Sequence, residues 1–233
     1  MGLLPASCHC GTVSFLISRP DPSISTLPHS NFPDLMLPYC RTSSSVISNH
    51  ADEKWWIRGG TGGAKSRYLA GTCACRSCRL GSGFEIQTWA FVPRANILFG
   101  IPSTAGGGRT ELKPLDFATL PRGVLQSYES SVGVIREFCG RCGATIFWHD
   151  KWRPDLIDVS VGLLRAPEGA RAETWLEWWT DRVSFAEEAG NERAGSVMNW
   201  ATTLIAYLED GLKKRQEPCE DEDSLWAQTQ RSC

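Results

Sequence analysis

The chain has 233 residues, of which 42% are hydrophobic and 21% are charged, as in an ordinary globular protein with one large domain. Its 24 basic and 26 acidic residues leave a formal net charge of −2, which argues against a general binder of nucleic acid or of anionic membranes. A chain of this length buries enough surface to fold without cross-links, so its ten cysteines need another explanation.

The first residues, MGLLPASCHC, do not resemble a signal that directs a protein to secretion, because they lack a basic region followed by a long apolar run. No apolar stretch approaches the roughly 18 residues of a membrane span. We therefore expect a cytoplasmic protein whose cysteines stay reduced, with neither a membrane nor nucleic acid among its partners.

The first predicted strand follows the first two cysteines, because Val13, Phe15 and Ile17 recur at every second position. Residues 18–70 are rich in Pro and Ser at their start and in Gly at their end, which predicts a long inserted loop. We expect the Trp-Trp-Ile run at 55–57 to anchor this loop on the core.

The middle of the chain predicts further strands. The run 84–92 is aromatic and β-branched, with Ala90 and Val92 on one face and Trp89 and Phe91 on the other. Residues 157–163 alternate between aliphatic residues and polar or small ones, and the run 146–149 also favours a strand. We expect this part of the chain to be mainly β.

The end of the chain predicts a helix that starts near Ser196, which we expect to cap it. Basic residues at 213–215 suit the negative end of the helix dipole, and an acidic tail follows. Apolar residues recur at helical spacing at Val197, Trp200, Ala201, Leu204, Leu208 and Leu212. The predicted organisation is a β domain over residues 5–188, followed by a helix and tail over 189–233.

Seven of the cysteines lie in three clusters: Cys8 and Cys10, the triplet Cys73, Cys75 and Cys78, and Cys139 and Cys142. Closely spaced cysteines are the usual ligands of zinc, because a tight turn directs two thiolates at one ion. The two pairs together supply the four ligands of a closed tetrahedral site. The triplet supplies three, which is typical of a catalytic zinc with an open position.

The residues alone leave other arrangements open. The triplet could take a fourth ligand from Cys40, from His50 or from one of the pairs. The pairs could form disulfides, and Cys75 and Cys78 could be a redox pair, although no βαβ pattern surrounds them. An iron–sulfur cluster usually needs four cysteines in or near one run, and the triplet has three.

These motifs resemble the glutathione-dependent formaldehyde-activating enzyme family, which includes centromere protein V. The resemblance extends over roughly residues 5–188. It rests on CHCG at 8–11, GTCACRSCR at 71–79 and FCGRCG at 138–143, supported by SG at 82–83, WAFVP at 89–93, YESS at 128–131 and IDV at 157–159.

The resemblance implies antiparallel layered sheets around two zinc sites. The two cysteine pairs would form the structural site, and the triplet would hold the catalytic zinc. It also implies a carbon–sulfur lyase-type enzyme that joins glutathione and formaldehyde to S-hydroxymethylglutathione, so that glutathione is the expected co-substrate and a small carbonyl compound the other.

Two segments depart from the family pattern, the long insertion at 18–70 and the added helix and tail at 189–233. A long loop before the triplet could reshape the substrate pocket. One alternative is therefore the same zinc site acting on a larger electrophile or a glutathione conjugate. Another is a zinc-stabilised binding module without catalysis.

Charge counting indicates which residues could assist the triplet. Three thiolates on Zn²⁺ leave a charge of −1, which suits binding of a substrate thiol as thiolate. Arg76 and Arg79 are predicted to offset this charge or to contact carboxylates of the thiol substrate. His149 is a candidate general base, although a histidine beside aromatic residues is more often structural. Five tryptophans are expected in the core: Trp148, Trp152, Trp175, Trp178 and Trp179.

Overall fold

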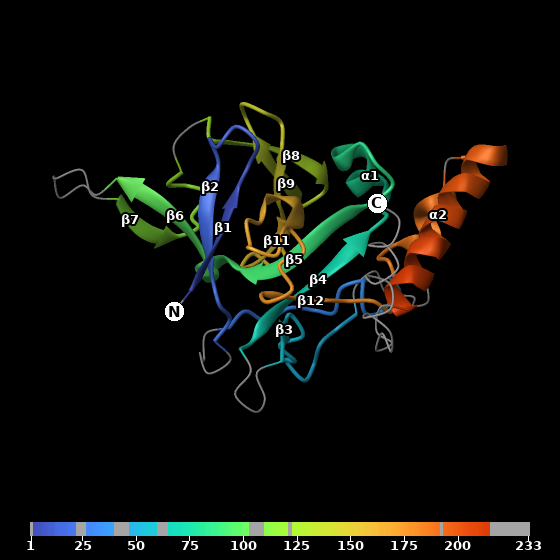
Figure 1. The fold of residues 1–233 in the computed structure, drawn as a ribbon, viewed down its shortest axis with the longest axis horizontal. Helices are drawn as coiled ribbons and strands as arrows, with labels where there is room; N and C mark the ends of the chain where they lie inside the picture. The colour runs from blue at the N-terminus through green and yellow to red at the C-terminus, as the bar shows by residue number, and fades with distance from the viewer. Residues whose placement is uncertain are drawn as a thin grey trace, which may run out of the picture.

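The computed structural model describes residues 2–21, 27–39, 47–59, 65–102, 110–120, 123–191 and 193–214. Within these ranges the fold is mainly β, as predicted, with two α-helices, α1 (Arg76–Ser82) and α2 (Gly195–Lys214). Both helices lie at one end of the molecule, and β6 and β7 lie at the other (Figure 1). In the described part of the chain, no helix combines the length and apolar character needed to cross a bilayer.

The smaller sheet has four antiparallel strands in the order β1-β2-β6-β7. The turn between the first two strands carries the first cysteine pair, and β2 confirms the strand predicted there. The strands are β1 (Leu3–Ser7), β2 (Ser14–Ser18), β6 (Ile97–Pro102) and β7 (Thr110–Pro114).

The larger sheet runs in the order β12-β4-β5-β11-β10-β9-β8, and β3 also pairs with β4. Its neighbouring strands are antiparallel except for β12 and β4, which are parallel. The strands are β3 (Ile57–Arg58), β4 (Arg67–Cys73), β5 (Gln87–Pro93), β8 (Leu125–Ser131), β9 (Val134–Cys139), β10 (Thr145–Asp150), β11 (Leu156–Ser160) and β12 (Leu176–Trp178).

The main core lies between the two sheets. Phe15 of the smaller sheet packs against Phe147 of the larger one, with ring centroids 5.1 Å apart. Ala90 and Val92 of β5 belong to this core, whereas Phe91 belongs to a second cluster on the opposite face. The alternation predicted for this strand is therefore confirmed, and it shows that both faces of the larger sheet are covered.

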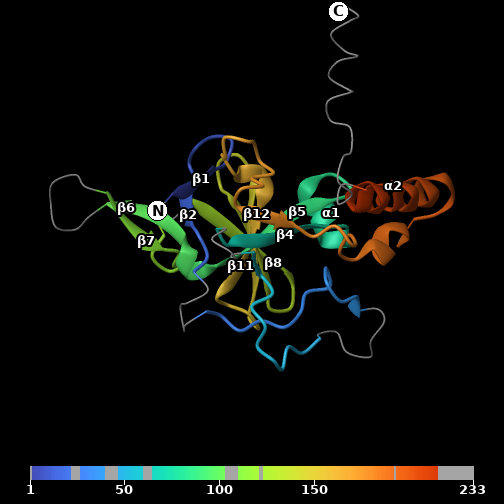
Figure 2. The ribbon, with the colours of Figure 1, turned by 60° about the horizontal axis from the view of Figure 1, so that its bottom comes forward.

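The inserted segment packs on the second face of the larger sheet (Figure 2). Trp56 is fully buried there, and the ring centroid of Trp55 lies 4.9 Å from that of Phe91, so the predicted anchor is confirmed. Gly71 of β4 permits this packing, because a Cβ atom at that position would lie 2.4 Å from Leu35 of the insertion.

Residues 18–70 are not wholly loop, which corrects the prediction. Ser18 ends β2, and β3 and the first residues of β4 lie in this range. Phe32 and Ile47 also form an isolated antiparallel bridge. Pairing with partners distant in sequence supplies backbone hydrogen bonds that the composition of a Pro- and Gly-rich segment does not reveal.

Helix α2 confirms the predicted C-terminal helix but differs in its details. It begins at Gly195, so Ser196 lies inside the first turn rather than capping it. Its buried residues are Ala201 and Ile205, whereas Val197 and Trp200 are more than half exposed. The helix lies at the margin of the domain, so only one stripe of its apolar residues meets a partner (Figure 1).

Two smaller predictions also need correction. Residues 161–163 form a 3₁₀ turn after β11 instead of continuing the strand. Trp152 is 62% exposed rather than in the core, although Trp175 is buried as expected. The short helix α1 was not predicted, because its seven residues, RSCRLGS, are mostly polar and show no apolar periodicity.

Candidate metal centres

The two cysteine pairs meet at one point, although they are far apart in sequence. Cys8 and Cys10 lie in the turn between β1 and β2, and Cys139 and Cys142 lie where β9 turns into β10. All four sulfurs lie within 4.8 Å of one another. We call this group the four-cysteine site.

The spacing of these sulfurs fits tetrahedral zinc. The Sγ atom of Cys8 lies 3.6 Å from that of Cys10 and 3.6 Å from that of Cys139, and the Cys10–Cys139 separation is 3.7 Å. Zinc–sulfur bonds of about 2.3 Å in a tetrahedron require sulfurs about 3.8 Å apart. The described cysteines are free thiols, which excludes disulfides among them.

Local hydrogen bonds favour the ionised, thiolate form of part of the four-cysteine site. A hydrogen bond with the Thr12 hydroxyl, at 3.2 Å, is the main reason that the pKa of Cys10 falls to about 6. The backbone N–H of Val13 donates to Cys8 Sγ at 3.3 Å. Burial has the opposite effect on Cys139 and raises its pKa to about 11, so cation binding there would release a proton.

The triplet is built around the start of α1. Cys73 ends β4, Cys75 caps α1, and Cys78 lies in the helix; their sulfurs lie within 4.8 Å of one another. The backbone N–H of Cys78 donates to Cys75 Sγ at 3.4 Å, as in an N-cap. The described residues add no fourth His, Cys, Asp or Glu ligand to this group.

Cys78 also receives two donors from the larger sheet. The indole N–H of Trp89 and the Nη2 atom of Arg136 each donate to Cys78 Sγ at 3.4 Å. Hydrogen bonds with Cys73 and Cys75 lower the pKa of Cys78 well below its ordinary value, and the Arg136 charge lowers it further. The thiolate charge of Cys78 in turn raises the pKa of Arg136, although burial opposes this effect.

Sequence reasoning missed Arg136, which is only 4% exposed. The signal in the sequence is an arginine three positions before Cys139, in a strand whose other charged residue is Glu137. That signal identifies a buried cation but not its partner, because Arg136 and Cys78 are 58 positions apart.

Aromatic residues surround the triplet. Trp148 and Phe185 pack against the cluster that Cys73, Cys78 and Trp89 form. The insertion reaches this wall, because the ring of Tyr39 lies edge-on to Phe185 with centroids 6.0 Å apart. This wall shields the thiolates from water on its side.

A buried charge group lies next to this wall. Arg153 lies over the ring of Trp148, 4.6 Å from its centroid, and contacts Asp158 at 2.8 Å and Asp150 at 3.3 Å. Burial raises the pKa of Asp158 to about 6, with Asp150 adding to the rise, because one guanidinium cannot offset two buried carboxylates.

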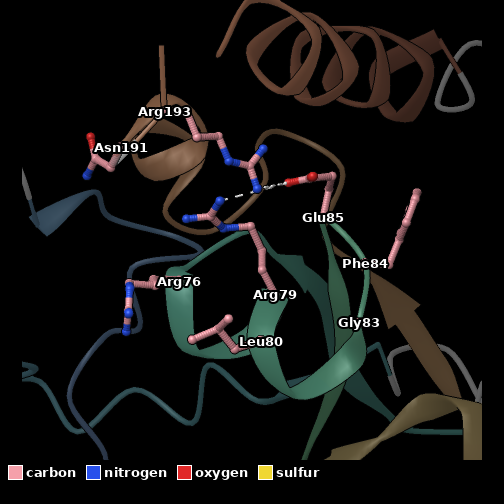
Figure 3. Close-up of a pocket in the computed structure, with 8 residues that line it drawn as sticks. All are labelled: Arg76, Arg79, Leu80, Gly83, Phe84, Glu85, Asn191 and Arg193. Carbon is pink, nitrogen blue, oxygen red and sulfur yellow. Dashed lines mark ion pairs between the residues drawn. The ribbon is translucent and has the colours of Figure 1, made fainter. Parts of the chain in front are cut away.

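The structure places Arg76 and Arg79 on the outer side of α1, where both line a separate cleft (Figure 3). The Nη1 atom of Arg79 lies 3.9 Å from Glu85, and its Nη2 atom donates to the Glu188 carbonyl at 3.5 Å. It is therefore Arg136, and not either of these arginines, that donates to a triplet sulfur among the described contacts.

The other candidate residues lie apart from both sites or outside the described ranges. His50 is exposed and belongs to neither cysteine group, and the same holds for His9, the residue between the first two cysteines. His149 contacts Glu137 at 3.2 Å and stacks on Phe117 with ring centroids 4.4 Å apart, as a structural histidine would. Outside the described residues lie Cys40, Cys219 and Cys233.

Comparisons with known proteins add little to this picture. No protein-family model matches the chain. No curated protein matches it either. Among solved structures, a Rhodobacter sphaeroides protein from a structural genomics programme is 14% identical and matches with a TM-score of 0.35, covering 75% of this chain and 98% of that one. A likeness at this score supports no inference, so the family stays a prediction from the motifs.

Proposed function

We propose that the protein is a zinc-dependent carbon–sulfur lyase-type enzyme that joins or cleaves an adduct of a thiol and a carbonyl compound. Glutathione is the expected thiol, and formaldehyde is the simplest carbonyl partner. The observation that carries the proposal is the unequal number of ligands, four sulfurs in one site and three in the other among the described residues.

The proposed reaction is an addition without oxidation. The sulfur–carbon bond forms, the carbonyl π bond opens, and the thiol proton ends on the new hydroxyl group; cleavage reverses these changes. A zinc ion held by the triplet would supply a position at which the substrate thiol loses its proton at neutral pH. Holding both reactants in one site lowers the entropic barrier.

The residues around Cys78 support this chemistry through charge. Three ligand thiolates and a substrate thiolate carry four negative charges, which exceed the charge of Zn²⁺ by two. Arg136 contributes one positive charge next to Cys78, and Trp89 contributes a neutral donor. Both donors are held by the sheet, so they need no rearrangement when the substrate binds.

One observation favours the alternative of a larger electrophile. The aromatic wall of Trp148, Phe185 and Tyr39 lies beside the triplet and offers more apolar surface than a one-carbon aldehyde can contact. Rates of adduct formation with formaldehyde and with an aromatic aldehyde, measured side by side, distinguish the two substrates.

The test begins with zinc stoichiometry on the full chain purified without chelator, and with glutathione titrated into it. We expect two zinc ions per chain in the wild type and about one in Cys75→Ser, with glutathione binding lost together with the second ion. Arg136→Gln should keep both ions but bind glutathione about tenfold more weakly, because the added thiolate loses its nearest cation.

Two results would count against the proposal. Two zinc ions without any response to glutathione would indicate a closed second site and favour the binding module. The variant Cys40→Ser then tests whether Cys40 is the fourth ligand. If it is, the variant loses the second zinc ion; if it is not, both ions stay bound. One zinc ion or none in the wild type would remove the metal argument altogether.

A further inference from the structure

A cleft of about 430 Å³ lies on the outer side of α1, away from the triplet sulfurs. One wall is α1 and the chain that follows it. On the other side lie Asn191 and Arg193, which follow the 3₁₀ helix η5 (Ala186–Gly190) (Figure 3). This second wall lies beyond residue 188, so the cleft is a feature of the added C-terminal part.

The described residues that line the cleft carry an excess of positive charge. Three of them are arginines, Arg76, Arg79 and Arg193, and one is an acid, Glu85. A second carboxylate, that of Glu188, accepts a hydrogen bond from the backbone N–H of Arg76 at 3.0 Å. Arg193 approaches Glu85 to 2.8 Å and Arg79 approaches it to 3.9 Å (Figure 3). One carboxylate shared by these two guanidinium groups leaves a net positive charge at the centre of the cleft.

The polar groups at this centre are incompletely satisfied. The side chain of Arg79 is only 9% exposed, and its Nε atom has no hydrogen-bond partner among the described residues. The same holds for the buried Nη1 atom of Arg193. Glu85 Oε2 accepts no hydrogen bond of good geometry despite its short distance to Arg193. Protein acceptors therefore offset the positive charge of these two arginines only in part.

The rim of the cleft is apolar. Leu80 is 68% exposed and Phe84 is 55% exposed, and both line the cleft beside the arginines. Large apolar side chains next to paired guanidinium groups suit a ligand with an anionic end and an apolar body.

We infer that this cleft binds a small organic anion, a carboxylate or phosphate that carries an apolar or aromatic group. The anion pairs with the guanidinium groups of Arg79 and Arg193 where these residues line the cleft, and the apolar part contacts Leu80 and Phe84. The inference does not depend on the proposed function, because none of the residues that line the cleft is a cysteine of the triplet.

The experiment measures binding of phenyl phosphate to the full chain by calorimetry. Inorganic phosphate and phenol, which represent the anionic and the aromatic part of this probe, are titrated separately for comparison. We expect one phenyl phosphate per chain, bound at least tenfold more tightly than either part. Arg193→Gln should weaken binding about tenfold or more, because a charge-assisted hydrogen bond is lost. Glu85→Gln should tighten it, because the competing carboxylate is removed.

A matched control is Arg94→Gln, which removes an arginine of another surface ion pair, 3.1 Å from Asp155. It should leave the affinity unchanged within about twofold, since its effect is confined to long-range screening. A gain of affinity in Glu85→Gln cannot arise from a misfolded chain. This variant can therefore still support or contradict the inference if Arg193→Gln proves unstable.

Four outcomes would overturn the inference. They are no phenyl phosphate binding, equal losses in Arg193→Gln and Arg94→Gln, weaker binding in Glu85→Gln, or loss of binding in Cys75→Ser. The last result would place the anion at the triplet. Retention of phenyl phosphate by Cys75→Ser, together with loss of its glutathione response, would establish two separate sites.

Discussion

At the scale of single residues, Arg136 shows how one side chain changes the electrostatics of a thiolate cluster. Its guanidinium is buried, and its Nη2 atom donates to Cys78 Sγ at 3.4 Å. It also donates through Nε to Ser130 at 3.3 Å, so its orientation is held from the neighbouring strand. A lysine at this position could not form both contacts in one plane.

Asp158 is a second residue whose environment matters, because burial changes the pH at which its carboxyl group ionises. Its pKa is raised from 3.8 to about 6, chiefly by burial. The unfolded chain therefore releases this proton at a lower pH than the folded chain. Ionisation favours unfolding, and the contribution of Asp158 to stability decreases as the pH rises from about 4 to about 6.

We predict that the unfolding free energy of the wild type, relative to Asp158→Asn, decreases by about 2 kcal/mol between pH 4 and pH 6.5. The asparagine does not titrate, so the difference between the two proteins isolates this carboxyl group. Denaturant unfolding at a series of pH values measures it. A difference that is flat with pH would show that Arg153 keeps Asp158 ionised in the folded state.

At the scale of elements, the insertion is joined to the triplet region by one carboxylate. Asp34 is buried and accepts hydrogen bonds from the backbone N–H of Tyr39 at 2.9 Å and from Arg182 at 2.9 Å. It also accepts from the Ser184 hydroxyl at 3.1 Å and from the Phe185 backbone N–H at 2.6 Å. Ser184 also forms an isolated parallel β-bridge with Cys73. The same short segment therefore holds both the insertion, through Asp34, and the first cysteine of the triplet.

We predict that Asp34→Ala loosens the insertion and costs about 3–5 kcal/mol, because the Ser184 hydroxyl and the Phe185 backbone N–H lose their acceptor and Arg182 keeps only Glu187. Limited proteolysis should then cut within residues 27–59, and denaturant unfolding measures the loss. The matched control is Asp52→Ala in the same insertion. Its carboxylate pairs with His29 and Lys54 but is 52% exposed, so it should cost under about 1 kcal/mol. Equal losses in the two variants would contradict the docking role of Asp34.

At the scale of the whole molecule, the four-cysteine site links the two sheets. Cys8 and Cys10 come from the β1–β2 turn of the smaller sheet, whereas Cys139 and Cys142 come from the end of β9 in the larger one. The triplet, by contrast, lies within one short stretch at the end of β4 and the start of α1. An ion in the four-cysteine site would therefore constrain the fold much more than an ion in the triplet.

We predict that Cys139→Ser or chelation of the four-cysteine site costs several kcal/mol of global stability, because metal affinity adds directly to folding free energy. Cys75→Ser should leave the global unfolding transition much closer to that of the wild type. Chelator titration followed by zinc release and by circular dichroism separates the two steps. If Cys75→Ser destabilises the chain as much as Cys139→Ser, the triplet also has a structural role.

The elements that could be predicted from the sequence are those that rest on local pattern. The aromatic and β-branched run 84–92 predicted a strand with apolar residues on both faces, and β5 confirms it from Gln87 onward. The spacing of cysteines within each turn predicted metal-binding groups, because a turn of two to four residues is enough to aim neighbouring sulfurs at one point. Composition alone missed β3 and the start of β4, which pair with each other across a Gly-rich segment, and β4 also pairs with the distant β12.

By itself, then, the sequence determined the three cysteine clusters, the mainly β class and the C-terminal helix, since each follows from residues close together in the chain. Only the tertiary structure decided which clusters combine, that Arg136 rather than Arg76 or Arg79 donates to the triplet, and that Arg79 and Arg193 meet at one cleft. The physical reason is distance along the chain. Electrostatic and hydrogen-bond partners are chosen by proximity in space, and strand pairing brings together residues that sequence spacing does not relate.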